Sequence, residues 1–252
     1  MRRISPQLRI LLAKELRQVR RSKGALASAT ILPLLLMTVM PLMQLLSLRD
    51  PVLASTLKQS SASVPPPMAQ FADDPPQFFV HVMLPMLLVL GGLIVPSVSA
   101  TYTIVAEREK RSLELLMALP ARVSDILLAK LLAMLVLALS VVLPLFTVDM
   151  LALLALGLVA AMDVVILLAL LLCALACSVA VALLLALLAR DFRTANNLNG
   201  AMLGPVILAV LGLLFGLPTP LSYVLLGALL LAAAVAALQI GLRWLTFERY
   251  LA

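Results

Sequence analysis

Long apolar runs alternate with short polar segments along the chain. Six of the runs are long enough to cross a bilayer, because a transmembrane helix needs about 20 predominantly apolar residues to span about 30 Å of hydrocarbon. Their limits are residues 24–48, 78–105, 126–148, 164–189, 201–217 and 221–243. The pattern predicts an all-α polytopic membrane protein with six transmembrane helices, which form one domain over residues 1–252.

Composition supports this prediction. Hydrophobic residues make up 63% of the chain and charged residues only 12%, and the mean hydropathy is +1.15. A soluble globule could not cover its surface with so few polar side chains. We therefore expect the chain to be embedded in a membrane.

The basic residues indicate the orientation. Residues 1–23, 107–130, 190–199 and the C-terminal end together carry 17 of the 19 Lys and Arg, and short cytoplasmic loops retain such residues. Six spans then put both termini in the cytoplasm, in a cytoplasmic (inner) membrane of bacterial type. The net charge of +7 reflects this orientation, so we expect no nucleic-acid partner.

A cleaved signal peptide ending at Val52-Leu53-Ala54 is the alternative reading of the N-terminal region, but the basic and apolar regions are too long for a signal peptide.

Residues 1–23 read as an amphipathic helix that begins at Ser5-Pro6. A leucine-rich stripe would lie in the acyl boundary and the cations near anionic head groups; a simple positively charged anchor explains the segment equally well. The residues expected at the membrane interface are Arg9, Lys14, Arg17, Arg20 and Arg21, with Trp244 and Tyr250 beside the last span.

Two regions on the predicted outer side are irregular. Residues 49–77 are rich in Ser, Pro, Gln and Asp and read as an external loop without a core of its own. The fifth span reads as short, and Pro218-Thr219-Pro220 ends it. Because irregular backbone within the membrane must be surrounded by protein or water, we expect this corner to pack inside the bundle.

Glycines recur at multiples of four along the fifth span. Such a glycine face permits close backbone contact with another helix, which can belong to the same chain or to a second subunit. The residues are Gly200, Gly204, Gly212 and Gly216.

The segment 106–120 places six charged side chains in eight consecutive positions between the second and third spans. Read as a helix, it pairs Glu107 with Arg111 at the favourable i,i+4 spacing and ends at Pro120. A solvated loop that retains positive charge would explain its cations but not its three glutamates. Charges of both signs favour a docking surface, because they set register and exclude wrong partners. The predicted docking residues are Glu107, Arg108, Glu109, Lys110, Arg111, Leu113, Glu114, Leu116 and Met117.

The stretch "AEREKRSLELLMALPARVSDILLAKLLA" resembles the corresponding segment of ABC-2 type transporter permeases, the membrane subunits of ATP-binding-cassette exporters. The matching positions are Glu107-Arg108-Glu109, Ser112-Leu113-Glu114, Leu115-Leu116, Pro120 and Lys130. Lys14-Glu15-Leu16 with Arg20-Arg21 is similar to the family's opening, and Phe247-Glu248-Arg249 to its ending. Ser112 departs from the threonine that often stands there. The resemblance implies that 106–120 is a coupling helix, which sits in a cleft of an ATPase subunit and transmits its movement to the spans.

Other candidate chemistry is sparse. His81 is the only histidine and reads as a helix-end residue near the outer surface, and no G-x-S-x-G surrounds any serine. Cys173 and Cys177 read as small core residues, with no metal spacing around them.

Asp149 and Asp163 flank the link between spans three and four. If they were buried deep, they would suggest an ion or proton site, but the loop position favours hydrated outer charges. Prolines and glycines in the first two spans mark points of flexing, at Pro33, Pro41, Pro85, Gly91, Gly92 and Pro96.

The resemblance therefore implies a permease subunit of an ABC exporter. Apolar spans with few intramembrane charges suit a hydrophobic or amphiphilic cargo. Its partners would be two ATPase subunits, a second permease copy or paralogue, and membrane lipids. The sequence has no G-x-x-x-x-G-K-[ST] phosphate loop, so we expect no enzyme activity, metal or cofactor in this chain; ATP and Mg²⁺ would bind to the ATPase. The alternatives are a membrane scaffold or sensor that recruits a cytoplasmic protein through 106–120, and an ion-coupled secondary carrier. An intramembrane protease is a more distant alternative.

Overall fold

The fold is known from a computed structural model that describes residues 6–21, 23–47, 74–100, 123–189 and 192–244. All regular structure in these ranges is helical, and six helical segments are long and apolar enough to cross a membrane. This confirms the predicted all-helical, six-span architecture. The predicted coupling helix 106–120, the external loop up to residue 73 and Tyr250 lie outside the described residues.

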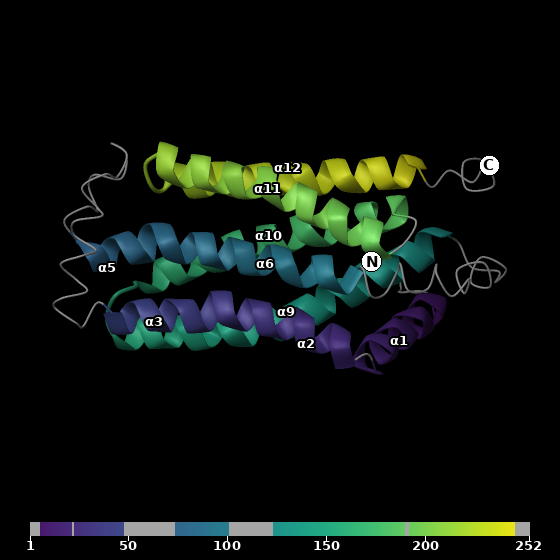
Figure 1. Ribbon diagram of the computed structural model, residues 1–252, viewed down its shortest axis with the longest axis horizontal. Coiled ribbons are helices and arrows are strands. Elements are labelled where there is room, and N and C mark those ends of the chain that lie inside the picture. Colours follow the sequence, from purple (N-terminus) through teal and green to yellow (C-terminus); the bar gives the residue numbers. More distant parts are fainter. Residues whose placement is uncertain (1–5, 22, 48–73, 101–122, 190–191, 245–252) are drawn as a thin grey trace.

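The six candidate spans lie side by side as an elongated bundle (Figure 1). The N-terminal helix is α1 (Pro6–Arg21); the first span is built from α2 (Lys23–Leu34), η1 (Leu35–Val39) and α3 (Met40–Ser47), and the second from α5 (Pro75–Phe78), η3 (Phe79–Met83) and α6 (Leu84–Ala100). The remaining spans are α9 (Val123–Ala155), α10 (Ala161–Leu188), α11 (Phe192–Gly216) and α12 (Leu221–Trp244). Helix α10 packs against α6, α9 and α12 and forms the centre of the bundle.

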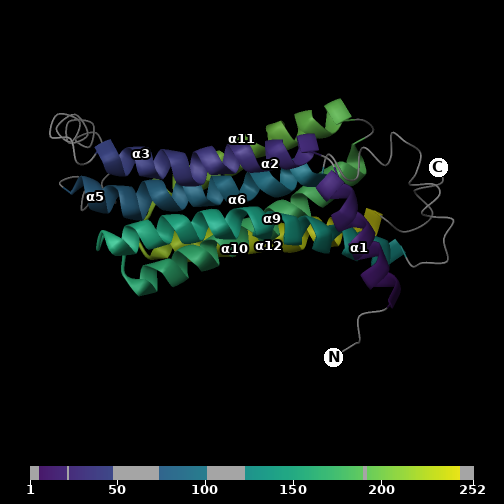
Figure 2. The same ribbon diagram turned by 90° about the horizontal axis from the view of Figure 1, so that it is seen from below.

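Helix α1 is not part of the parallel bundle. It lies at one end, at an angle to the spans, and packs against α9 (Figure 2). The C-terminal end of α12 lies at the same end of the bundle (Figure 1). We call this end, which holds α1, the base, and the opposite end, which holds the link between α9 and α10, the link end.

A proline stands two residues after each of the two π-helical turns. In both turns the last hydrogen bond spans five residues, from Met40 N–H to Leu35 O before Pro41, and from Leu84 N–H to Phe79 O before Pro85. Proline lacks an N–H group, and its ring clashes with the carbonyl four residues earlier, so a wider turn relieves the clash. The carbonyl four residues before Pro85 belongs to His81, and the Tyr223 hydroxyl donates a hydrogen bond to it at 2.6 Å. This bond joins α12 to the second span.

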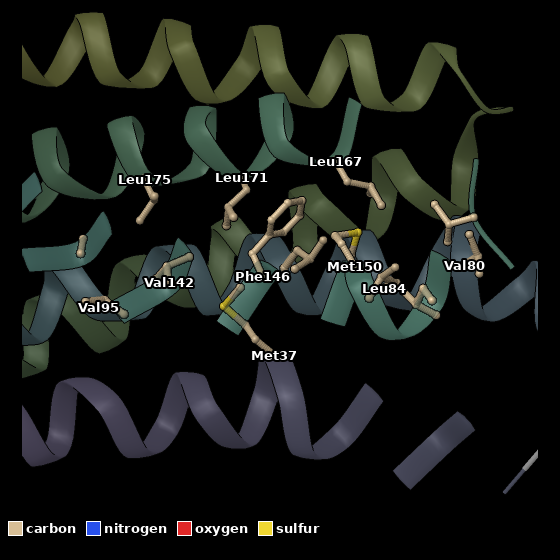
Figure 3. Packing of buried hydrophobic residues seen from close by; sticks show 14 of the residues in the cluster. Met37, Val80, Leu84, Val95, Val142, Phe146, Met150, Leu167, Leu171 and Leu175 are labelled. Atoms are coloured by element: carbon tan, nitrogen blue, oxygen red, sulfur yellow. The ribbon is translucent and has the colours of Figure 1, made fainter. Parts of the chain in front are cut away.

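The core between the first three spans and α10 is apolar and tightly packed. Met37 extends from the first span toward Phe146 of α9, and Leu171 of α10 faces the same cluster (Figure 3). Gly91 makes room for Met37, because a Cβ at this position would overlap Met37 Cγ and lie 2.6 Å from its Sδ. A Cβ on Gly92 would likewise meet Leu171 Cδ1 at 3.1 Å. The two glycines thus allow close packing between helices.

Helix α9 is longer than the sequence prediction. It continues past Val148 to Ala155 and ends in a Schellman motif, in which Leu158 N–H bonds to Leu153 O and Gly157 N–H to Leu154 O. Gly157 takes the positive φ of 68° that this motif requires. The link to α10 is therefore short, and Asp149 lies within the helix.

The fifth span also differs from the prediction. Helix α11 begins at Phe192, so residues that read as a polar link form its first turns, and the candidate span covers 24 residues, Arg193–Gly216. It ends before Pro218-Thr219-Pro220, as expected, but Pro218 and Pro220 are exposed. The prediction that this corner packs inside the bundle is therefore wrong for the single chain.

Candidate functional site

A buried ion pair joins α1 to α9 at the base of the bundle. Lys130 Nζ donates a hydrogen bond to Glu15 Oε1 at 3.1 Å, and the two side chains are only 4% and 3% exposed. Lys14 Nζ also lies 3.7 Å from the same oxygen, but its side chain is 44% exposed. Buried charges are stable only when paired, so this contact fixes how α1 sits on the third span.

Glu15 is not fully satisfied by this pair. Its second oxygen, Oε2, is buried and has no hydrogen-bond partner among the described residues. Taking a carboxylate out of water costs several kcal/mol, and a single ion pair only partly offsets that cost. The pair therefore contributes more to the position of α1 than to the net stability of the fold.

Glu15 and Lys130 belong to two separate sequence motifs, and the structure brings them into contact. Glu15 belongs to the N-terminal Lys14-Glu15-Leu16 motif and Lys130 opens the third span, 115 positions later. The predicted interface cations were Arg9, Lys14, Arg17, Arg20 and Arg21. All five lie on α1, and the side chains of Lys14 and Arg17 are exposed. Trp244 is the last residue of α12, at the same end of the bundle.

The glycine face of α11 makes no contact within the described chain. A Cβ added at Gly200, Gly204, Gly212 or Gly216 would meet no atom within 4 Å. Leu208 lies four residues from both Gly204 and Gly212, and therefore on the same face of the helix. It is 71% exposed. Packing against another helix of the same chain, which was one of the two explanations for these glycines, is therefore not seen among the described residues.

A small cavity with mostly apolar walls and a few polar groups lies between α6, α10 and α11. It has a volume of about 30 Å³, which is enough for one or two waters. The Ser178 hydroxyl, from α10, donates to Leu93 O, and Asn199 Nδ2, from α11, donates to Ser97 O at 3.4 Å. The apolar part of the lining is formed by Leu93, Val181, Leu185, Met202 and Val206.

The two aspartates at the link end have different environments. Asp163 caps α10, because its Oδ2 accepts a hydrogen bond from Ala160 N–H at 3.0 Å. Asp149 is 2% exposed and lies inside the membrane-spanning part of α9. The prediction of a hydrated outer charge is therefore wrong for Asp149: α9 continues beyond it and turns it toward the core. Within the described ranges, no three His, Cys, Asp or Glu side chains come close enough to hold a metal ion.

Comparison with known proteins gives one match. The model of the ABC-2 family transporter proteins matches residues 9–232, a range that covers most of α1 and the first five candidate spans completely. No curated protein and no solved structure matches the chain in such comparisons.

Proposed function

Since the chain belongs to the ABC-2 family of transporter proteins, we propose that it is the membrane subunit of an ATP-driven exporter. It moves a hydrophobic or amphiphilic cargo out of the cytoplasm, while separate ABC ATPase subunits bind ATP and Mg²⁺. The family supplies the class of protein; the direction, the cargo and the ATPase contact belong to the proposal.

The observation that carries the proposal is the buried Glu15–Lys130 pair. Lys130 lies ten residues after Pro120, which ends the predicted coupling segment 106–120, and its partner fixes α1 to the same helix. A force applied to that segment would act on α9 and α1 together. Such a joint is what a membrane subunit needs in order to convert ATPase movement into displacement of its spans.

The orientation follows from the base of the bundle. Helix α1 carries most of the basic residues of the N-terminal arm, and the end of α12 lies at the same end of the bundle. Basic residues mark the cytoplasmic side, so in this proposal the base faces the cytoplasm and the ATPases, and the link end faces outward.

The open glycine face supports a second copy of the chain in the complex, with two ATPase subunits below. Helices approach closely where small residues line the contact. Leu208, which projects between Gly204 and Gly212, would insert into the corresponding glycine surface of the other copy, in a symmetric contact.

The nature of the cargo is proposed from the walls of the bundle. Charged side chains are rare along the described spans, and the cavity between α6, α10 and α11 combines apolar walls with hydroxyl and amide groups. These features suit an amphiphile. Because the cavity holds only water-sized groups in this state, passage would require the helices to move apart, as alternating access demands.

Purification of the tagged full-length chain from its native membranes in mild detergent tests the proposal. We expect an ABC ATPase subunit in stoichiometric amount, and its loss when Glu107→Arg and Glu114→Arg reverse the charge of the predicted docking helix. Arg17→Glu is the control, because it reverses an exposed charge on α1. Recovery of the chain alone, or with a partner that lacks a phosphate loop, would favour a secondary carrier or a scaffold instead.

A further inference from the structure

Asp149 is the most deeply buried acidic group of the described spans that the proposed function does not use. Both of its carboxylate oxygens are buried, and no described residue donates a hydrogen bond to either. Its neighbours one turn away on α9 are Phe146, Leu153 and, directly adjacent, Met150, all members of the apolar core. The carboxyl group therefore faces an apolar interior.

The side chain of Thr38, on the first span, lies near this carboxyl group. It lies in the π-helical turn η1, which packs against α9. Its hydroxyl is also buried, and like the carboxylate oxygens it has no partner within hydrogen-bond geometry among the described residues. Two polar groups thus face each other from opposite helices, close enough to interact but not hydrogen-bonded.

No positive charge compensates Asp149 in the described part of these helices. Turn η1 and helix α6 carry no titratable residue. Helix α10 carries Asp163, Cys173 and Cys177, and Asp163 is used as the cap of that helix. In η3, His81 lies on the second span. The cations that α9 and α1 do carry, Lys130 among them, belong to the base and not to the link end.

We propose that Asp149 and Thr38 form a proton-binding site between the first and third spans, and that the bound proton keeps these spans together. An isolated ionised carboxylate is very unfavourable in an apolar interior, and such a group takes up a proton instead. The neutral acid can share a hydrogen bond with Thr38 after a small side-chain movement. Loss of the proton would create a charge that needs water, and water can reach it only if the first span moves away from α9.

The pH dependence of stability tests the proposal. The folded state holds the proton more tightly than the unfolded chain, so the free energy of unfolding falls as pH rises. We expect the melting temperature of the full-length protein in lipid nanodiscs to fall from mildly acidic to alkaline pH. Asp149→Asn, which is neutral at every pH, should abolish this fall and be more stable than the wild type at alkaline pH.

Two control substitutions make the test specific. Asp163→Asn changes an acid on the neighbouring helix and should keep the wild-type pH profile. Thr38→Val removes the hydroxyl that lies near the carboxyl group, so the pH at which stability falls should shift, whereas Thr147→Val, on the exposed side of α9, should leave that pH unchanged. If Asp149→Asn keeps the wild-type profile, or if Thr38→Val and Thr147→Val behave alike, the proposal is wrong.

Infrared difference spectra of the same samples, recorded between acidic and alkaline pH, give an independent readout. A protonated carboxyl group has a carbonyl stretching band that the carboxylate lacks. The wild type should show a band that disappears in Asp149→Asn and persists in Asp163→Asn. Equal spectra for the wild type and Asp149→Asn would show that Asp149 does not bind the proton.

Discussion

Replacing Lys130 with Met should destabilise the protein far more than a typical surface substitution. The Nζ–Oε1 separation of 3.1 Å corresponds to about 5 kcal/mol of attraction at an effective dielectric constant of about 20. Lys130→Met removes that attraction and leaves Glu15 buried without its partner. Breaking such a pair typically costs about 3–5 kcal/mol, and we expect a loss in this range. Glu15→Gln with Lys130→Met removes both charges and should recover most of it.

The assay is a double-mutant cycle measured by unfolding in detergent, with Lys14→Met as the matched control. Lys14 lies near the same Glu15 oxygen, at 3.7 Å, but is 44% exposed. Solvent screens such a pair, so its removal should cost less than about 1 kcal/mol. The reasoning predicts that breaking the Glu15–Lys130 pair is costly because the pair is buried. Equal losses of unfolding free energy for Lys130→Met and Lys14→Met, or no recovery in the double variant, would refute it.

Substitutions at a buried and at an open glycine should affect different properties, the stability of the fold and the dimer fraction. Gly91→Ala should destabilise the protein by about 1–3 kcal/mol, because the new methyl group overlaps Met37 in a filled core. Thermal unfolding measures the loss, and the losses of Gly91→Ala and Met37→Ala should be less than additive in the double variant, because Met37→Ala also removes the overlap. Gly212→Leu meets open space in the single chain, so it should leave the fold intact but reduce the dimer fraction in cross-linking, and an unchanged dimer fraction would contradict the proposed subunit contact.

The apolar runs were sufficient to predict the six spans, because length and hydropathy alone decide whether a helix can cross a bilayer. Helix ends were harder to predict. The third span was expected to end before Asp149, yet the residues that follow are again apolar, and Gly157 is the signal that ends the helix. A single charge is weak evidence for a helix end when the helix can bury it against a neighbour.

The contacts of the candidate site could not be predicted from local patterns. Glu15 and Lys130 each stand in a recognisable motif, but their pairing depends on how α1 crosses α9. The same holds for Thr38 and Asp149, which meet only because a π-helical turn and a long α9 place them on facing helices. The openness of the glycine face likewise depends on which helices pack against α11.

In the proposed function, the segment 106–120 transmits ATPase movement to the spans. The test is the ATP hydrolysis rate of the purified complex in lipid vesicles, compared between the wild type, Glu107→Arg with Glu114→Arg, and the exposed control Arg17→Glu. We predict that the control retains stimulation of the ATPase by the membrane subunit, whereas the Glu107 and Glu114 reversal inserts normally but loses it. Unchanged stimulation in that double variant would contradict the account.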